Sequence, residues 1–433
     1  MDPLRGNEAL GSGSPRTILL TQGELVDYGG SEMVTLELAE YLSRVGWSVH
    51  VLTNFISEPM LKEFRPLNGV TVHTNADTVD ATELDLIWVH HQLLPEAIVD
   101  MAEQGLLTAK VVFHHMSPFV PLEFPLFARV ENWLADAILF NSAETQRALE
   151  SALSSLEVRG EVFGNPAPDT FWSDPAGRTY RAALARLLIV SNHMPTEIWE
   201  AVQELRAEGV EVRAVGRFPG AEARRTRPDD LEWADAVVSI GKTVQYAIVN
   251  GLPAYCYDHF GGSGWLDSEN FGKNAELNFS GRGFKSKGAS EIVDELVHGF
   301  TDAQDFARRA HVEHGPHYLL SYRWQQVMDG LAKHDSTRST LEPSEKATFT
   351  ATQRYLWELH RASRVHWEHM VAVSGDLAEQ LRLVDDVRRH DADQKAQITD
   401  LQAQLDSLKK SRAWRIGALL RWLNATAHRW GLR

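Results

Sequence analysis

Two pairs of histidines could carry acid–base chemistry, because each pair ends an apolar run. His90 and His91 end one run, and His114 and His115 end the next. A histidine at the carboxyl end of a buried strand faces a ligand bound there, and its imidazole can exchange a proton near neutral pH. We therefore predict that His114 or His115 is catalytic. The alternative is that these histidines are hydrogen-bonded members of the core.

A glycine-rich loop directly precedes the first expected helix and carries Gly29, Gly30, Ser31 and Glu32. Glycines allow the backbone to approach a ligand closely, and a helix N-terminus offers free N–H groups to an anion or a sugar hydroxyl. We predict that the two glycines contact a donor and that Ser31 and Glu32 face an acceptor. The alternative is an ordinary helix cap, with Ser31 capping and Glu32 favouring the dipole. The spacing is not GxGxxG, so a nicotinamide cofactor is not indicated.

A second loop of this kind lies much later in the chain, where Ser239 ends a strand and Gly241, Lys242, Thr243 and Gln245 begin a helix. Glycine and lysine at a helix start suit a diphosphate, through backbone N–H groups, the helix dipole and a point charge. The GxxxxGK[ST] spacing of a P-loop is absent. We predict that these five residues bind the donor; the alternative is a solvated lysine beside turn glycines.

Further candidates follow other expected strands of the same half. Arg217 suits phosphate oxygens, and a solvated role is the equal alternative. We favour solvation for the nearby Arg224, Arg225 and Arg227. Asn192 and Asp258 also follow strands and are assigned to the donor site, with 257–264 expected to be a flexible loop beside it. No metal ligands are predicted, because the strict Asp-x-Asp at 391–393 falls in an expected tail helix.

These residues must be positioned by strands that alternate with helices. Apolar runs and helical spacing alternate through 16–165, and the alternation restarts at 183–315 after a proline-rich break at 165–169. Such alternation predicts parallel sheets covered by helices, with ligands at the carboxyl ends of the strands. The sequence therefore predicts an α/β fold of two Rossmann-like domains that face a cleft.

The C-terminal part has a different pattern. A helix is expected over 316–335, and 345–410 shows no strand signal. Four apolar residues spaced as in a coiled-coil seam predict self-association through this long helix: Ile398, Leu401, Leu405 and Leu408. Residues 411–433 read as a basic amphipathic tail, because 409–433 holds seven Lys or Arg, no acidic residue and three tryptophans. This composition predicts contact with an anionic membrane surface.

Charge and cysteine content exclude several classes of function. The 433 residues carry a formal charge of −16, which argues against a nucleic-acid binder. The single cysteine, Cys256, allows neither an intrachain disulfide nor a multi-cysteine zinc site. No apolar run approaches the roughly 20 residues of a membrane span. We therefore expect a cytoplasmic protein with peripheral contact at the inner face of the plasma membrane.

Several of these segments together resemble the bacterial glycosyltransferases of the GT-B fold, family 4-like. The similarity lies in the order and spacing of four segments: Gly29 to Val49, Asp136 to Ser142, Gly164-Asn165-Pro166, and Ala234 to Pro253. The start of the tail, Ser411 to Arg421, resembles an ending found on polysaccharide-synthesis glycosyltransferases.

The resemblance implies a nucleotide-sugar donor in the second domain, an acceptor in the first, and a helix at 316–335 that crosses back. It also implies a strand-end histidine near the transferred sugar, at His114 or His115. Gln245 stands where the family has a glutamate, and Asn192-His193-Met194 stands where it has basic residues.

From these observations we expect a hexosyltransferase that moves a sugar from a nucleoside diphosphate to a cell-surface polysaccharide or a lipid-linked acceptor. No metal and no cofactor are expected beyond the nucleotide sugar as co-substrate. Two alternatives stay open: a catalytically inactive glycosyltransferase-like scaffold, which Gln245 favours, and a nucleotide-sugar epimerase.

Overall fold

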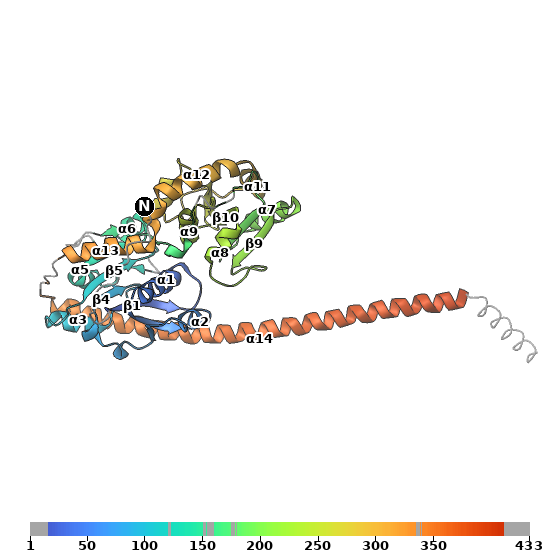
Figure 1. Cartoon of the computed structure of the whole chain (residues 1–433). Helices are drawn as coiled ribbons and strands as arrows, with labels where there is room; N and C mark the ends of the chain where they lie inside the picture. The colour runs from blue at the N-terminus through green and yellow to red at the C-terminus, as the bar shows by residue number, and fades with distance from the viewer. Residues whose placement is uncertain are drawn as a thin grey trace, which may run out of the picture. The chain divides into compact units, whose positions relative to one another are not determined.

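The computed structural model describes residues 16–119, 123–149, 153, 160–174, 178, 180–334, 338 and 340–410 (Figure 1). The chain forms two compact units, Met1–His360 and Arg361–Arg433, which are considered separately. The first unit contains two sheets, and the basic tail predicted at 411–433 lies outside the described residues.

Within the described residues, the first sheet has seven strands in the order β3-β2-β1-β4-β5-β6-β7, and its paired neighbours are all parallel. The strands are β1 (Thr17–Leu25), β2 (Ser48–Ile56), β3 (Val70–His73), β4 (Leu86–Val89), β5 (Lys110–His115), β6 (Ala137–Phe140) and β7 (Glu161–Val162). The centres of β4 and β5 are apolar runs, Leu86–Val89 and Val111–Phe113, as a parallel sheet buried on both faces requires.

Helices cover both faces of this sheet. One face packs on α1 (Gly30–Arg44) and on α13 (Leu320–Lys333), which returns from late in the sequence and contributes Trp324. The other face packs on α3 (Glu96–Glu103), on α5 (Ala128–Leu134) and on Phe349. The remaining helices of this half are α2 (Met60–Phe64) and α6 (Ala143–Leu149).

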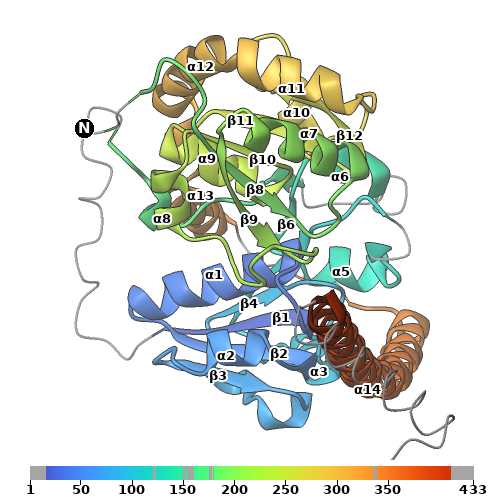
Figure 2. The same ribbon diagram turned by 90° about the vertical axis from the view of Figure 1, so that its right-hand side faces the viewer.

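The described part of the second sheet has five strands in the order β12-β11-β10-β8-β9, with β12 antiparallel to β11 and the other pairs parallel. The strands are β8 (Arg186–Ser191), β9 (Glu211–Gly216), β10 (Ala236–Ser239), β11 (Ala254–Asp258) and β12 (Gly261–Trp265). Its helices are α7 (Thr196–Ala207), α8 (Pro228–Trp233), α9 (Lys242–Asn250), α10 (Phe271–Glu276), α11 (Ala289–His298) and α12 (Phe300–Glu313). The prediction of an α/β fold with two mainly parallel sheets is confirmed. Figure 2 shows α1 on the side of the first sheet that faces the second.

The prediction of a flexible loop at 257–264 is wrong. The glycine-rich stretch within 257–264 forms β12, an edge strand that pairs with β11. A Cβ on Gly262 would lie 2.0 Å from the backbone oxygen of Cys256, so the close pairing depends on glycine at this position. The register also shifts between Cys256 and Tyr257, which fits a bulged edge.

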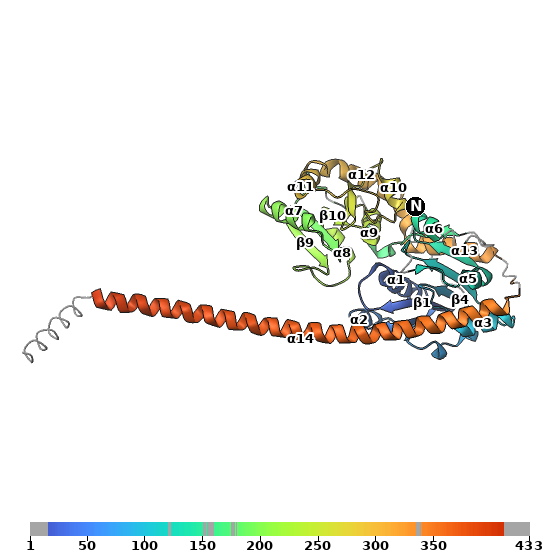
Figure 3. The same ribbon diagram turned by 180° about the vertical axis from the view of Figure 1, so that it is seen from behind.

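A 68-residue helix, α14 (Pro343–Lys410), follows the second sheet, as expected over 345–410. Its first turns belong to the first unit and lie beside α3, where Lys346 is 2.5 Å from Asp100 (Figure 3). In the second unit the described side chains of this helix are mostly exposed, and Leu401 of the predicted seam is 62% exposed. Within the described residues, no helix has the length and apolar character of a membrane span.

Candidate functional site

A cavity of about 400 Å³ opens where the carboxyl ends of the two sheets meet. Residues that follow β1, β5 and β6 line it from the first sheet, and residues that follow β8, β10 and β11 line it from the second. This volume lies within the range of about 300–1,000 Å³ typical of small-molecule sites. Nine predicted residues line it: Gly29, Gly30, Ser31, Asn192, Ser239, Gly241, Lys242, Thr243 and Asp258.

The first glycine-rich loop reaches the cavity because α1 begins there. Gly29 is the N-cap, and Gly30 and Ser31 begin the helix within the cavity wall. The Glu32 carboxylate folds back over the loop: a Cβ on Gly29 would lie 2.3 Å from Glu32 Oε2. Burial raises the pKa of Glu32, and its carboxylate accepts a hydrogen bond from the Ser31 hydroxyl at 2.9 Å. Glu32 therefore supports the loop from behind and is not among the residues that line the cavity.

The second loop reaches the cavity through the start of α9. Gly241 is the N-cap with φ 59° and ψ −128°, a conformation that essentially only glycine adopts. The Gly241 N–H donates to Phe279 O at 2.7 Å, which fixes the turn. The N–H groups of Lys242 and Thr243 begin the helix and have no acceptor within it. These two N–H groups are the part of the cavity wall best suited to an anion.

Lys242 lies in the cavity wall, but its ammonium group is already paired. Lys242 Nζ is 2.7 Å from Glu37 Oε2 on α1 and donates to Pro166 O at 2.9 Å. The Tyr246 hydroxyl donates to the other oxygen of Glu37. Burial raises the pKa of Glu37, and the nearby Lys242 charge counteracts that rise. Lys242, which we predicted to contact a phosphate, therefore also forms an ion pair between the two halves of the first unit, the half built on the first sheet and the half built on the second.

The cavity wall also carries a carboxylate, that of Asp258. Asp258, at the end of β11, accepts from the Ser191 hydroxyl at 3.1 and 3.0 Å and from the His259 N–H at 2.8 Å. Burial raises the pKa of Asp258. An ionised carboxylate is an acceptor only, so Asp258 suits sugar hydroxyls better than phosphate oxygens. Asn192 beside it donates to Tyr28 O of the first half at 3.3 Å.

Gln245 lies behind the cavity. Its side chain is 1% exposed and donates to Asn278 Oδ1 at 3.0 Å. Asn278 also accepts from the Asn165 amide at 3.3 Å, and both asparagines line the cavity. Asn278 has φ 54°, a left-handed conformation that asparagine adopts more readily than other residues with side chains. Gln245 therefore helps to position Asn278 at the cavity wall.

The arginines are arranged differently from the expectation. Arg217 pairs with Asp27 of the first half, and its side chain is 53% exposed outside the cavity wall. Arg224 and Arg225, for which solvation was favoured, both line the cavity. Arg224 holds Asp230 in two hydrogen bonds of 2.7 Å, whereas Arg225 lies 2.7 Å from Glu40 and 3.2 Å from Glu63. Solvation is therefore wrong for these two arginines, because each is paired and partly buried.

His114 is buried beside His90 and Trp88 and is not part of the cavity wall. The Trp88 N–H donates to His90 Nε2 at 2.9 Å, so His90 Nε2 is an acceptor and His90 Nδ1 carries the proton. His114 Nδ1 lies 3.1 Å from the same Nε2. Burial, with the neighbouring His115, lowers the pKa of His114 to about 3, so this imidazole is neutral near pH 7.

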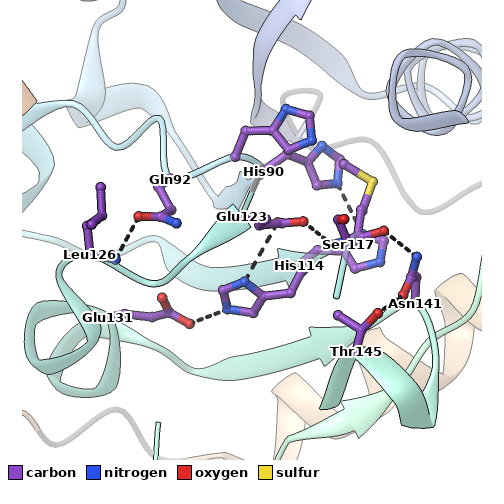
Figure 4. A network of polar contacts seen from close by, with 12 residues as sticks. His90, Gln92, His114, Ser117, Glu123, Leu126, Glu131, Asn141 and Thr145 are labelled. Carbon is purple, nitrogen blue, oxygen red and sulfur yellow. Dashed lines mark hydrogen bonds and ion pairs between the residues drawn. The ribbon is translucent and has the colours of Figure 1, made fainter. Parts of the chain in front are cut away.

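His115 is equally buried and is held by two glutamates, Glu123 and Glu131. Figure 4 shows these two glutamates in the same polar network as His90 and His114. His115 Nε2 lies 2.6 Å from Glu131, and Nδ1 lies 3.7 Å from Glu123. Burial alone would lower its pKa, but the two carboxylates outweigh burial and raise the pKa of His115 to about 10. Burial and pairing favour the core alternative for both histidines, since neither contacts the cavity.

A polar chain nevertheless joins His114, through His90, to the cavity. Thr35 Oγ1 lies 3.2 Å from His90 Nδ1 and donates to Gln22 Oε1 at 3.0 Å. The Gln22 amide then donates to Ser31 Oγ at 3.3 Å, at the cavity wall. The histidine cluster can therefore orient Ser31 from a distance.

Sequence reasoning missed several residues of the cavity wall. They are Tyr28, Met116, Asn141, Asn165, His193, Tyr246, His259 and Asn278. Met116, Asn141, His193 and His259 follow strand ends by one or two residues, so the strand-end rule would have found them. Tyr246 and Asn278 carry no such signal, because only the packing of α9 against the loop after α10 brings them there. In the described part of the chain, no three His, Cys, Asp or Glu side chains are grouped as metal ligands.

Comparisons with known proteins gave similarity in structure only. No protein-family model matches the chain, and no curated protein does. A solved structure of Anabaena Alr3699/HepE in complex with UDP and glucose is 16% identical, with a TM-score of 0.45, over 73% of this chain and 99% of that one. CalG4, the calicheamicin glycosyltransferase, is 14% identical over 74% and 99% of the two chains, with a TM-score of 0.40. SnogD, a glycosyltransferase from Streptomyces nogalater, is 14% identical over 73% and 100%, with a TM-score of 0.37.

Proposed function

We propose that this protein is a glycosyltransferase that takes a sugar from a nucleoside diphosphate donor. The observation that carries the proposal is the single cavity into which both glycine-rich helix starts open, Gly29 to Ser31 from one sheet and Gly241 to Thr243 from the other. A donor on the second sheet and an acceptor on the first would meet at that point. Ligands of open α/β sheets bind at the carboxyl ends of strands, which is where this cavity lies.

The donor diphosphate would lie against the start of α9. The N–H groups of Lys242 and Thr243 would donate to its oxygens, and Arg225 and the Lys242 ammonium would supply positive charge. The ion pairs of Glu37 with Lys242 and of Glu40 with Arg225 would then weaken. Asp258 would accept from hydroxyls of the sugar.

In the transfer, the bond from the anomeric carbon to the diphosphate oxygen breaks and a bond to an acceptor hydroxyl oxygen forms. The acceptor hydroxyl loses its proton, and the leaving diphosphate takes the electron pair. Stabilising that leaving group is the main task of the site. We propose that the protein groups do this without a metal ion.

Calorimetry and a turnover assay test the proposal together. UDP, GDP, ADP and TDP, and then their glucose derivatives, are titrated into the full chain, and nucleotide release is followed with and without acceptor glycans. Binding abolished by Gly241→Val, with release that requires an acceptor, is the expected result. Absence of binding by every nucleotide would overturn the proposal.

A second candidate is a catalytically inactive module that binds the nucleotide sugar as a scaffold. The specific observation in its favour is that Lys242 and Arg225 are already paired with carboxylates, while Gln245 is buried and serves Asn278. Binding without release in the same assay, with every acceptor tested, would select this candidate.

We further propose that the acceptor is a cell-surface polysaccharide or lipid-linked glycan reached at the inner face of the plasma membrane. The basic composition of 409–433 supports this membrane contact, and the apolar spacing of 398–408 supports self-association through α14. Flotation with anionic and neutral vesicles, using the full chain and a chain ending at Leu408, tests the first point. Sedimentation equilibrium of both chains and of one ending at His360 tests the second. Equal flotation by both chains, or a monomer for the full chain, would contradict the respective point.

A further inference from the structure

A second cavity, of about 550 Å³, lies on the first sheet and has no part in the proposed donor site. Residues at the carboxyl ends of β2, β3 and β4 form its walls, and the first turns of α14 close it. Its polar lining includes Asn54, Asp77, Glu96, Gln353 and Arg354, and its rim carries the ring of Trp357. The cavity exists only because a helix from the end of the chain returns to this sheet edge.

The closing helix is firmly anchored. Phe349 is fully buried and packs edge-on against Phe127, with ring centroids 5.1 Å apart. The Thr350 hydroxyl donates to Glu96 at 2.6 Å, and the Gln353 amide donates to Gln92 O at 2.9 Å. Trp357 follows Gln353 by one helical turn, so these contacts fix the helix backbone that carries Trp357 to the cavity. The tryptophan is 50% exposed there.

The composition of the walls identifies the class of ligand. Leu52, Leu94 and Pro95 make an apolar floor, and amide, carboxylate and guanidinium groups surround it. A diphosphate would meet Asp77 and Glu96 with only Arg354 to balance them, and a wholly apolar ligand would leave the polar groups unpaired. A sugar ring matches both features, because it has hydroxyl groups at its edge and C–H groups on its face. An aromatic ring offers a flat apolar contact to such a face.

We infer that this cavity binds an oligosaccharide, with one sugar ring stacked on Trp357 and its hydroxyls on Asn54, Asp77 and Arg354. This site is separate from the proposed nucleotide site. It would contact a part of the glycan that lies several bonds away from the reacting atoms.

The position of the cavity makes this glycan the acceptor. Thr53 lines the second cavity and is in register with Gln22 on the neighbouring strand. Gln22 in turn donates to Ser31 of the first cavity. Both cavities lie at the carboxyl-end edge of the first sheet, bordered by α1 on one face and by α14 on the other, so the bound glycan would pass around this edge to reach the first cavity. This acceptor role rests on the proposed function, whereas glycan binding itself does not.

A glycan array tests the inference, with Trp357→Ala compared with Tyr355→Ala. Tyr355 is a matched control, because it is 66% exposed on the same helix and does not line the cavity. The probes are bacterial polysaccharides and defined oligosaccharides of three to six sugars printed on the array, and the best binder is then titrated in calorimetry. We expect Trp357→Ala to weaken its binding about tenfold and Tyr355→Ala to leave it unchanged. Melting temperatures of all three proteins show whether the fold is kept.

The outcomes separate this inference from the proposed function. No binding by any printed glycan, or equal binding by wild type and Trp357→Ala, overturns the oligosaccharide site even if UDP-glucose is turned over. Glycan binding that depends on Trp357 supports the site even if no nucleotide binds to the first cavity. If turnover occurs, Trp357→Ala should raise KM for the glycan and leave KM for the nucleotide sugar unchanged.

Discussion

The charge on His115 is linked to folding, because Glu131 and Glu123 hold the imidazolium inside the first sheet. The pKa of His115 is raised to about 10, above the ordinary value of 6.5, so the folded state binds the proton more tightly than the unfolded chain does. The resulting stability is fully present below pH 6.5 and is lost as the pH rises toward 10. We therefore predict that the free energy of unfolding falls between pH 7 and pH 9.5.

Chemical denaturation across this pH range checks the prediction. The control is the double variant His115→Gln with Glu131→Gln, which keeps the shape of the pair and removes both charges. Its stability should change less with pH than that of the wild type. Parallel pH profiles for the two proteins would show that His115 is not the group responsible.

Gly241 should tolerate no side chain, because its φ of 59° and ψ of −128° lie outside the regions open to other residues. We predict that Gly241→Ala lowers the free energy of unfolding by about 1–3 kcal/mol, the usual cost of such backbone strain. Nucleotide binding should fall with it, since the start of α9 would move. The matched control is Gly330→Ala within α13, where an added Cβ meets nothing within 4 Å and helix propensity improves. Urea titrations of both variants would decide, and a loss at Gly330 equal to that at Gly241 would contradict the argument.

At the scale of whole elements, the first turns of α14 should contribute strongly to the stability of the first unit. Phe349 is fully buried between α14 and α5, whereas Tyr355 on the same helix is 66% exposed. We predict that Phe349→Ala costs about 3–5 kcal/mol of unfolding free energy, as is usual for a buried phenylalanine. Tyr355→Ala should change it by less than about 0.5 kcal/mol. Equal effects in guanidinium titrations would mean that the base of α14 is not part of the folded core.

The elements that sequence reasoning found are those with a strong local signal. The buried strand β4 is an unbroken apolar run, β5 has an apolar centre at Val111–Phe113, and α1 has clear helical spacing. The strands it missed all lie at sheet edges: β3 is partly exposed, β7 has only two residues, both exposed, and β12 is read from its glycines as a loop. An edge strand has few neighbours to select its residues, so its pattern is weak.

The same limit applies to the candidate site. Loops that follow strands could be placed at the sheet edge from the chain order alone, and most of them do line the cavity. The sequence could not show which arginine faces the cavity, because the position of Arg225 depends on its ion pairs with Glu40 and Glu63, two residues far away in the sequence. Nor could it show the burial of His115, which depends on Glu123 and Glu131 arriving from the segment after β5.

At the scale of the whole first unit, basic side chains of the second half pair with acidic side chains of the first. Lys242 binds Glu37, Arg225 binds Glu40 and Glu63, and Arg282 lies 3.1 Å from Glu144. Partly buried pairs of this kind are screened less by salt than exposed ones. They hold the two sheets together around the first cavity.

We predict that Arg225→Ala loosens this contact and Arg217→Ala does not. Arg225 is 26% exposed with two carboxylate partners, while Arg217 is 53% exposed, where an ion pair contributes little. Hydrogen–deuterium exchange should therefore become faster in α1 peptides of Arg225→Ala and stay unchanged in Arg217→Ala. Faster exchange in both variants, or in neither, would contradict a selective role of Arg225.

The pairing of Lys242 with Glu37 has a kinetic consequence for the cavity it borders. A ligand that needs the Lys242 charge can bind fully only after Glu37 has withdrawn, so a unimolecular step stands between encounter and complex. The observed rate of nucleotide association would then level off at high concentration, at the rate with which this pair separates. Glu37→Gln removes the competing charge and would raise that plateau. The same variant would therefore lose stability and bind the nucleotide faster. Glu37 belongs to the half of the first unit opposite the proposed nucleotide site, and its separation from Lys242 would then set the rate of ligand entry.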